Sequence, residues 1–221
     1  MINSFEVKDV MSNNSITLFW NVDTQEDFID AGGNLYVLEA EKIRPVLKQI
    51  TTLAKELGIR VMNTCDFHHI NAEEISENPD FITKFPPHCL AGTTGAQFIS
   101  ETDPETPLII DWDFELAIFA EFDDPKRFRN IVLRKNEFDV FTGNPYTDKI
   151  LNILQPDQIF VYGVTTNICV DRVAVGLAER GIKVYVIGDA IMGLPNLPLP
   201  YDSWKAIGIE IILFAEIGKY L

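Results

Sequence analysis

An acid, a lysine and a cysteine each stand where a predicted strand ends. Asp23 follows the apolar run 16–22, Lys135 follows the run 130–134, and Cys169 follows the run 158–163 near the first turn of a predicted helix. A cysteine becomes a strong nucleophile when a proton acceptor and a positive charge lie beside it. Each residue alone has an ordinary explanation: Asp23 as a turn acid, Lys135 as a solvated charge and Cys169 as a small buried side chain. Their joint occurrence at strand ends indicates a hydrolase with an activated thiol.

A second group of residues has the composition of a metal site. All three histidines fall within residues 68–88, and Asp66 precedes His68 by two positions. In an extended segment these two side chains lie on the same side and can chelate one ion. Carboxylate and imidazole ligands together suit zinc, iron or manganese, whereas the alternative is a polar surface loop. The other nearby candidate ligands are His69, Glu73, Glu74, Glu77 and His88.

A parallel sheet is needed to bring these positions together. The runs 16–22 and 59–64 are predicted strands, and the amphipathic segment 41–57 between them is a predicted helix that ends at Gly58. Such a βαβ unit implies parallel strands. The alternation recurs, which predicts one α/β domain over residues 1–221, doubly wound and mostly parallel, with helices on both faces in three layers. The further predicted strands are 130–134, 158–163, 183–187 and 209–214. The further predicted helices are 147–154 and a segment that ends at Gly181 and has an apolar face of Val170, Val173, Ala174, Leu177 and Ala178.

Composition excludes several classes of function. The chain has 221 residues, 47% hydrophobic and 23% charged, and a net charge of −15, which opposes binding to nucleic acid or to an anionic membrane surface. It contains no apolar run of about 18–20 residues and no glycine-rich phosphate loop. Three cysteines without an N-terminal signal pattern predict free thiols in a cytoplasmic protein. Cys65 and Cys89 are expected to be structural.

Five segments in order along most of the chain resemble the nicotinamidase group of the isochorismatase-like cysteine hydrolases. The first and last identify the superfamily, and the Asp-x-His and Pro-Pro-His segments indicate the nicotinamidase group. The segments are Val22-Asp-Thr-Gln-Glu-Asp-Phe28, Asp66-Phe-His68, Phe85-Pro-Pro-His-Cys-Leu-Ala-Gly-Thr93, Arg134-Lys135 and Gly163-Val-Thr-Thr-Asn-Ile-Cys169.

The resemblance implies that Asp23, Lys135 and Cys169 form a catalytic triad. Cys169 would attack the amide carbonyl of nicotinamide to form a thioester, Asp23 would carry protons, and Lys135 would keep Asp23 ionised and oriented. The products would be nicotinate and ammonia, a reaction of NAD salvage. The family also implies a cis peptide at Val164–Thr165, and an oxyanion hole formed by the backbone N–H groups of Thr165 and Cys169.

The same resemblance implies one divalent ion beside the triad, held by Asp66, His68 and His88. The ion would bind the ring nitrogen of the substrate and orient the ring. Phe28 and Phe85 would form the apolar walls of the pocket.

The chain departs from the family at several positions. Glu74 stands where many members have a third histidine, and Glu73 and Glu77 are near enough to compete with it as the fourth ligand. Zinc is the expected ion. Iron and manganese are alternatives, because an added carboxylate favours a harder metal than three imidazoles would. Phe85 replaces a common tryptophan, and Asn167 replaces a frequent aspartate.

The spacing between His88 and Lys135 exceeds that of compact relatives and predicts an insertion near 101–128. Its aromatic residues could cover the site or mediate homo-oligomer formation. Two other functions stay open, a related hydrolase for another small amide and a metal-binding relative without activity. The aromatic residues of interest in the insertion include Trp112, Phe114, Phe119 and Phe122.

Overall fold

A computed structural model describes residues 15–80, 83–113 and 125–221. Seven strands form one sheet in the order β3-β4-β2-β1-β5-β6-β7, and every neighbouring pair is parallel. The predicted fold class is therefore confirmed. The strands are β1 (Thr17–Val22), β2 (Arg60–Asp66), β3 (Leu108–Ile110), β4 (Asn130–Lys135), β5 (Gln158–Val164), β6 (Lys183–Met192) and β7 (Glu210–Ile212).

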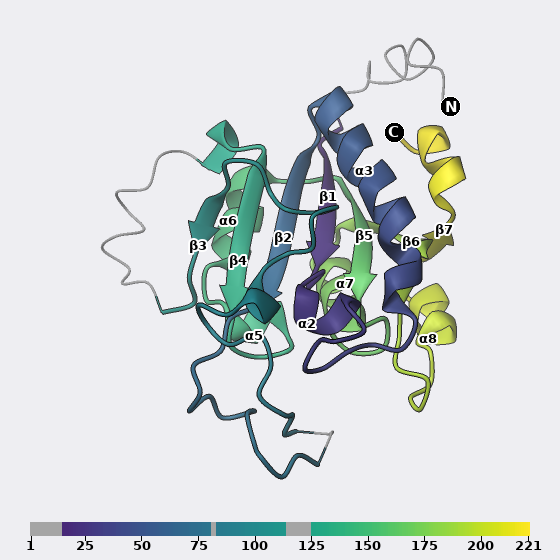
Figure 1. Ribbon diagram of the computed structural model, residues 1–221. Coiled ribbons are helices and arrows are strands. Elements are labelled where there is room, and N and C mark those ends of the chain that lie inside the picture. Colours follow the sequence, from purple (N-terminus) through teal and green to yellow (C-terminus); the bar gives the residue numbers. More distant parts are fainter. Residues whose placement is uncertain (1–14, 81–82, 114–124) are drawn as a thin grey trace.

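Helices cover both faces of the sheet (Figure 1), with α3 in front of it and α6 and α7 behind it. None of the helices in the described part of the chain is long and apolar enough to cross a bilayer. The α-helices are α2 (Glu26–Ile29), α3 (Arg44–Leu57), α5 (Val140–Gly143), α6 (Thr147–Leu154), α7 (Cys169–Glu179) and α8 (Tyr201–Ala206). The 3₁₀ helices are η1 (Ala40–Ile43), η2 (Thr94–Ala96), η3 (Pro125–Arg127) and η4 (Phe214–Lys219).

Two apolar clusters form the core, one on each face of the sheet. In β1, Leu18 and Trp20 belong to the cluster that includes α6 and α7, and Phe19 belongs to the cluster that includes α3. This alternation follows from the two-residue period of a strand, and burial on both faces explains why the strand is almost continuously apolar. The core therefore fixes the direction and position of the central strands.

The helix α3 illustrates how the sequence sets an element. Pro45 lies in its first turn, and its buried positions Leu47, Ile50 and Ala54 recur every three or four residues. Gly58 ends the helix with φ 66°, and its N–H donates to the carbonyl of Ala54 or Lys55. The expected helix 41–57 is thus present, but it begins with the 3₁₀ turn η1.

Two strand boundaries differ from the predictions. The predicted last strand ends early, at Ile212, because Phe214 starts η4 and its N–H donates to Asp189 Oδ1 at 2.8 Å. β6 continues to Met192 rather than ending at residue 187. Residues 101–128, where the sequence predicts an insertion, include the short edge strand β3 and η3, whereas Phe114, Phe119 and Phe122 lie outside the described residues.

The sheet order places a crevice at the ends of the central strands. From β1 the chain moves outward to β2, and it later returns to β5 on the other side of β1. In open α/β sheets ligands bind at such a reversal, beyond the carboxyl ends of the strands. The long segment between β2 and β3 lies at this end of the sheet (Figure 1).

Candidate active site

Asp23, Lys135 and Cys169 come together at the carboxyl ends of β1, β4 and β5. Asp23 and Lys135 are fully buried, and Lys135 Nζ lies 3.1 Å from Asp23 Oδ2. The same Nζ lies 3.9 Å from Cys169 Sγ. Asp23 has a left-handed backbone with φ 48°, which Asp tolerates better than most residues, and its N–H donates to the Thr64 carbonyl. The turn after β1 thereby directs this carboxylate toward the lysine.

Lys135 also binds a second carboxylate, which the sequence analysis did not predict. Its ammonium donates to Asp66 Oδ1, and the two residues are direct partners in the register of β2 and β4. Burial lowers the pKa of Lys135, but the attraction of the two carboxylates is the stronger effect and raises the pKa well above its usual value. Lys135 is therefore a permanent cation between two acids.

The two acids respond to this shared cation in opposite directions. Burial raises the pKa of Asp23, and the opposing attraction of Lys135 does not cancel the increase. Burial also raises the pKa of Asp66, but Lys135 and the neighbouring imidazoles have the larger combined effect and bring the pKa well below its usual value. When neighbouring acids have divergent pKa values, their roles separate. Asp23 has the affinity to accept a proton, while Asp66 stays an anion.

Cys169 is a thiol at rest. Burial raises its pKa well above the usual value, although Lys135 acts in the opposite direction. A thiol of this kind needs a base during attack, because only the thiolate is strongly nucleophilic. All three cysteines are free and buried.

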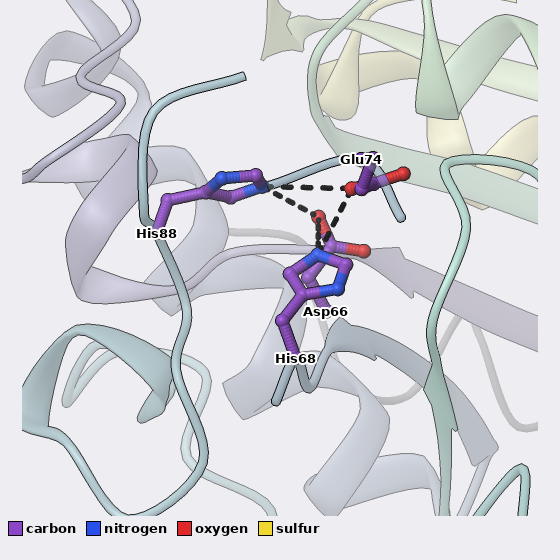
Figure 2. Close-up of side chains that lie close together, drawn as sticks. All are labelled: Asp66, His68, Glu74 and His88. Atoms are coloured by element: carbon purple, nitrogen blue, oxygen red, sulfur yellow. Dashed lines mark ion pairs between the residues drawn. The ribbon is translucent and has the colours of Figure 1, made fainter. Parts of the chain in front are cut away.

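The four residues Asp66, His68, Glu74 and His88 form a compact group, as Figure 2 shows. Their ligating atoms lie within 4.8 Å of one another. Glu74 Oε1 is 3.0 Å from His68 Nε2 and 3.8 Å from His88 Nε2. Asp66 Oδ2 is 3.8 Å and 3.7 Å from the same two nitrogens. Four ligands at about 2.1 Å around a tetrahedral ion would be separated by about 3.4 Å, so the spacing fits a divalent metal ion.

The hydrogen bonds of the two imidazoles support this interpretation. His88 Nδ1 lies 2.8 Å from the Pro86 carbonyl, an arrangement that directs its Nε2 toward the group. Both ring nitrogens of His68 are buried without a well-aligned hydrogen bond among the described residues, and Nε2 faces the carboxylates of Glu74 and Asp66. Burial lowers the pKa of His68, but Asp66 and Glu74 raise it to about 9. A cation, either a proton or a metal ion, is thus favoured between these carboxylates.

Short backbone bridges bring the loop ligands to Asp66. His68 pairs with Leu90 through hydrogen bonds to the backbone of Cys89 and Ala91. A second bridge joins Ile75 to Phe85, and the Phe85 N–H donates to the Glu74 carbonyl. These bridges decide which glutamate reaches the group: within the described residues Glu74 does so, whereas Glu73 and Glu77 do not. His69 lies outside it, against the ring of Trp112.

Gln25 is a buried residue of the site that the sequence analysis missed. Its amide Nε2 donates to the Asp66 carbonyl at 2.8 Å, and its Oε1 accepts from the Asp66 N–H at 2.8 Å. Nε2 also donates to the Ala96 carbonyl. One side chain therefore pairs with both backbone groups of Asp66 and holds the end of β2 in place. Its position two residues after Asp23 was the available signal.

A cavity of about 210 Å³ joins the thiol to the metal ligands. This volume is below the roughly 300–1,000 Å³ of pockets for drug-sized ligands, so it suits a smaller molecule. Phe28 and Phe85 line it, and both rings lie next to the His88 ring. Phe138 lines it as well and was not predicted. The other residues of the wall include Asp66, Glu74, His88, Val164, Thr165, Ile168, Cys169 and Leu194.

The turn from β5 into α7 contains a cis peptide bond at Val164–Thr165. Gly163 before it has φ 121°, and a Cβ there would lie 2.0 Å from the Val22 carbonyl oxygen, so glycine is required. The backbone N–H groups of Thr165 and Cys169 donate to no other group in the described part of the chain. They lie at the start of α7, where the helix dipole favours negative charge. Asn167 instead bonds to Leu194 and Leu197.

The chain is similar to known proteins over most of its length. The isochorismatase domain family matches residues 113–198. The chain is 27% identical to a nicotinamidase/pyrazinamidase from Mycobacterium tuberculosis over 78% of this chain and 84% of that protein. It is 28% identical to a nicotinamidase from Acinetobacter baylyi over 86% of this chain and 89% of that protein.

A solved structure has the same fold. The crystal structure of the pyrazinamidase of Pyrococcus horikoshii in complex with zinc superposes with a TM-score of 0.67. It shares 25% sequence identity, and the alignment covers 90% of this chain and 99% of that chain. These similarities indicate an amidohydrolase that is related to the isochorismatase-like proteins.

Proposed function

We propose that this enzyme hydrolyses nicotinamide to nicotinate and ammonia through a thioester on Cys169. The observation that carries the proposal is the position of Lys135, which contacts Asp23, Asp66 and Cys169 at once. The thiol and the metal ligands line the same small cavity. The two curated relatives are a nicotinamidase/pyrazinamidase and a nicotinamidase, which supports the choice of substrate.

In the first half of the reaction, Asp23 would take the proton of the Cys169 thiol while Sγ bonds to the amide carbon. The carbonyl oxygen would become an oxyanion, bound by the backbone N–H groups of Thr165 and Cys169. Asp23 would then pass its proton to the amide nitrogen, and the C–N bond would break to release ammonia. Lys135 would hold the Asp23 carboxylate toward the thiol and offset the charge that develops on sulfur.

In the second half, a water molecule would attack the thioester carbon and give one proton to Asp23. The C–S bond would break, and the sulfur would recover the proton from Asp23. The acid product would release its remaining proton to solvent and leave as nicotinate. One carboxylate thus serves as base and acid in both halves. Its raised pKa suits this exchange, because efficient proton transfer requires an acid and a base of comparable strength.

Asp66, His68, Glu74 and His88 would hold a divalent ion, zinc first among the candidates and iron or manganese next. The bound ion would supply a Lewis acid that binds the ring nitrogen of the substrate. Phe28 and Phe85 would enclose the ring on its apolar faces. We also assign the reaction to NAD salvage and the enzyme to the cytoplasm. The three free cysteines support the assignment to the cytoplasm.

Ammonia release from nicotinamide tests the proposal. Wild-type protein should release ammonia, and Cys169→Ala should lose this activity by at least about a thousandfold, because the nucleophile is gone. Cys65→Ala is the matched control, since Cys65 is also buried but lines a different cavity. Metal content and thermal unfolding should be the same in both variants. Full activity in Cys169→Ala would refute the thioester mechanism.

A further inference from the structure

The hydroxyl of Thr165 is buried in the wall of the active-site cavity and lacks a partner. Thr165 is 8% exposed, and its Oγ1 makes no hydrogen bond with any described residue. Burying a hydroxyl without a partner is unfavourable, so such groups call for an explanation. Thr165 lines the same cavity as Cys169, which suggests a bound molecule as the missing partner.

Other buried polar atoms without a hydrogen bond in the described part of the chain do not share this position. Asp23 and His68 belong to the charged site already described. Trp20 Nε1 and Thr64 Oγ1 are also without a partner, but neither residue lines the cavity. Thr165 is thus the uncharged residue that combines a buried polar atom lacking a hydrogen bond with a place in the lining of the cavity.

We infer that the Thr165 hydroxyl accepts a hydrogen bond from the amide N–H of the substrate and selects for carboxamides. This inference rests on the proposed function. In that reaction the amide carbonyl oxygen already has two backbone donors, from Thr165 and Cys169, and the amide nitrogen carries two hydrogens. A hydroxyl has two acceptor lone pairs, so it complements the N–H side of the amide. Thr165 would thereby contact both polar groups of one carboxamide: its backbone N–H would donate to the carbonyl oxygen, and its hydroxyl would accept from the amide N–H.

The consequence is discrimination between an amide and the corresponding ester. A site that pairs with a substrate N–H binds an analogue without it more weakly, because the polar group of the protein is left unpaired. Methyl nicotinate has the same ring and carbonyl as nicotinamide but no N–H, so it is the matched probe. Removing the hydroxyl should weaken nicotinamide turnover and leave the affinity for methyl nicotinate unchanged.

The experiment compares Thr165→Val, which keeps the shape, with Thr165→Ser, which keeps the hydroxyl. Thr165→Val should lower kcat/KM for nicotinamide by about 10–100-fold, the loss expected for one hydrogen bond of about 1.4–2.8 kcal/mol. Thr165→Ser should stay within about threefold of the wild type. The inhibition constant of methyl nicotinate should be the same in the wild type and in Thr165→Val. Thr51→Val is the control, because its hydroxyl donates to Leu47 within α3.

Two results would overturn the inference. One is an unchanged kcat/KM in Thr165→Val, and the other is an equal loss for nicotinamide and methyl nicotinate, which would place the hydroxyl on the carbonyl oxygen. Thr165→Ala provides a second hydroxyl-free variant, and metal content and thermal unfolding verify the fold of each. Failure of the wild type to release ammonia from nicotinamide would refute the proposed function itself. An active wild type with unchanged Thr165 variants would refute only the role of Thr165.

Discussion

Lys135 and Asp66 form a buried ion pair that connects the thiol to the metal ligands. The lysine contacts one carboxylate oxygen of Asp66, and the other oxygen faces the Nε2 atoms of His68 and His88. Buried charges are stable only when they are compensated. Lys135 offsets one of the three nearby carboxylates, those of Asp23, Asp66 and Glu74, and a divalent ion would offset the other two. The charge balance of the site therefore favours a bound divalent ion.

Asp66→Asn should damage both halves of the site. The substitution removes a metal ligand and leaves Lys135 with Asp23 as its remaining anionic partner. We expect copurified metal to fall, activity to fall by at least about a hundredfold, and the free energy of unfolding to fall by about 3 kcal/mol, as when a buried pair is broken. Elemental analysis, ammonia release and urea unfolding measure the three effects.

Asp111→Asn is the matched control for Asp66→Asn. Asp111 pairs with Arg134, the residue before Lys135, but in a partly exposed position. It should cost no more than about 1 kcal/mol and leave metal content unchanged. If Asp66→Asn retains metal and activity at the level of this control, Asp66 does not join the two halves of the site.

Glu74→Ala should lower metal affinity by at least about a hundredfold, because a ligand is lost from the group of four. Glu73→Ala should leave the affinity unchanged. Competition with a chelator, followed by elemental analysis, measures both. Unchanged affinity in Glu74→Ala would transfer the fourth position to Glu73, Glu77 or water.

Glu74→His should shift the metal preference of the site from manganese toward zinc, since imidazole is the softer ligand.

Gln25→Ala should destabilise the protein by roughly 2–4 kcal/mol in denaturant unfolding, because the Asp66 N–H and carbonyl lose their buried partner. The loss should also weaken metal binding, since Asp66 is no longer held in position. Gln97→Ala, on an exposed side chain of a nearby loop, should change neither property. A Gln25→Ala variant as stable as Gln97→Ala would show that the paired amide does not support Asp66.

Glu26→Gln should stabilise the protein at high pH. Burial and the nearby Asp30 and Glu101 raise the pKa of Glu26 from 4.5 to about 7, although Arg44 opposes the shift. The unfolded chain loses this proton near pH 4.5 and the folded protein near pH 7, so wild-type stability falls as pH rises through this interval. The Tm of Glu26→Gln should exceed that of the wild type at pH 8 and match it near pH 4. Glu56→Gln, on an exposed position of α3, should show no such difference.

Strand ends were the most informative feature of the sequence. Asp23, Asp66, Lys135 and Cys169 could be placed at one edge of the sheet because parallel strands share a direction and each run ends at a chemically distinctive residue. The pairing of Lys135 with Asp66 could not be foreseen, because it depends on the register of β2 against β4. Apolar runs buried on both faces do not specify that register.

Loop residues were less predictable, because loops lack the hydrophobic periodicity that identifies helices and strands. The choice of Glu74 over Glu73 and Glu77 depends on two isolated bridges that involve residues 68, 75, 85 and 90. The edge strand β3 has only three residues, too few for a pattern to emerge. Phe138 and Thr165 line the cavity from turns whose paths follow from tertiary packing. The roles of the individual site residues stay predictions that the variants above test.

The most direct test of the central proposal is ammonia release from nicotinamide after metal removal. Purified protein is stripped with a chelator, verified as folded, and reloaded separately with zinc, iron and manganese. Stripped protein should release little ammonia, and at least one of the three ions should restore release. Release that is equally fast without metal would contradict the role of the metal group, and folded protein that releases none with any ion would contradict nicotinamide as the substrate.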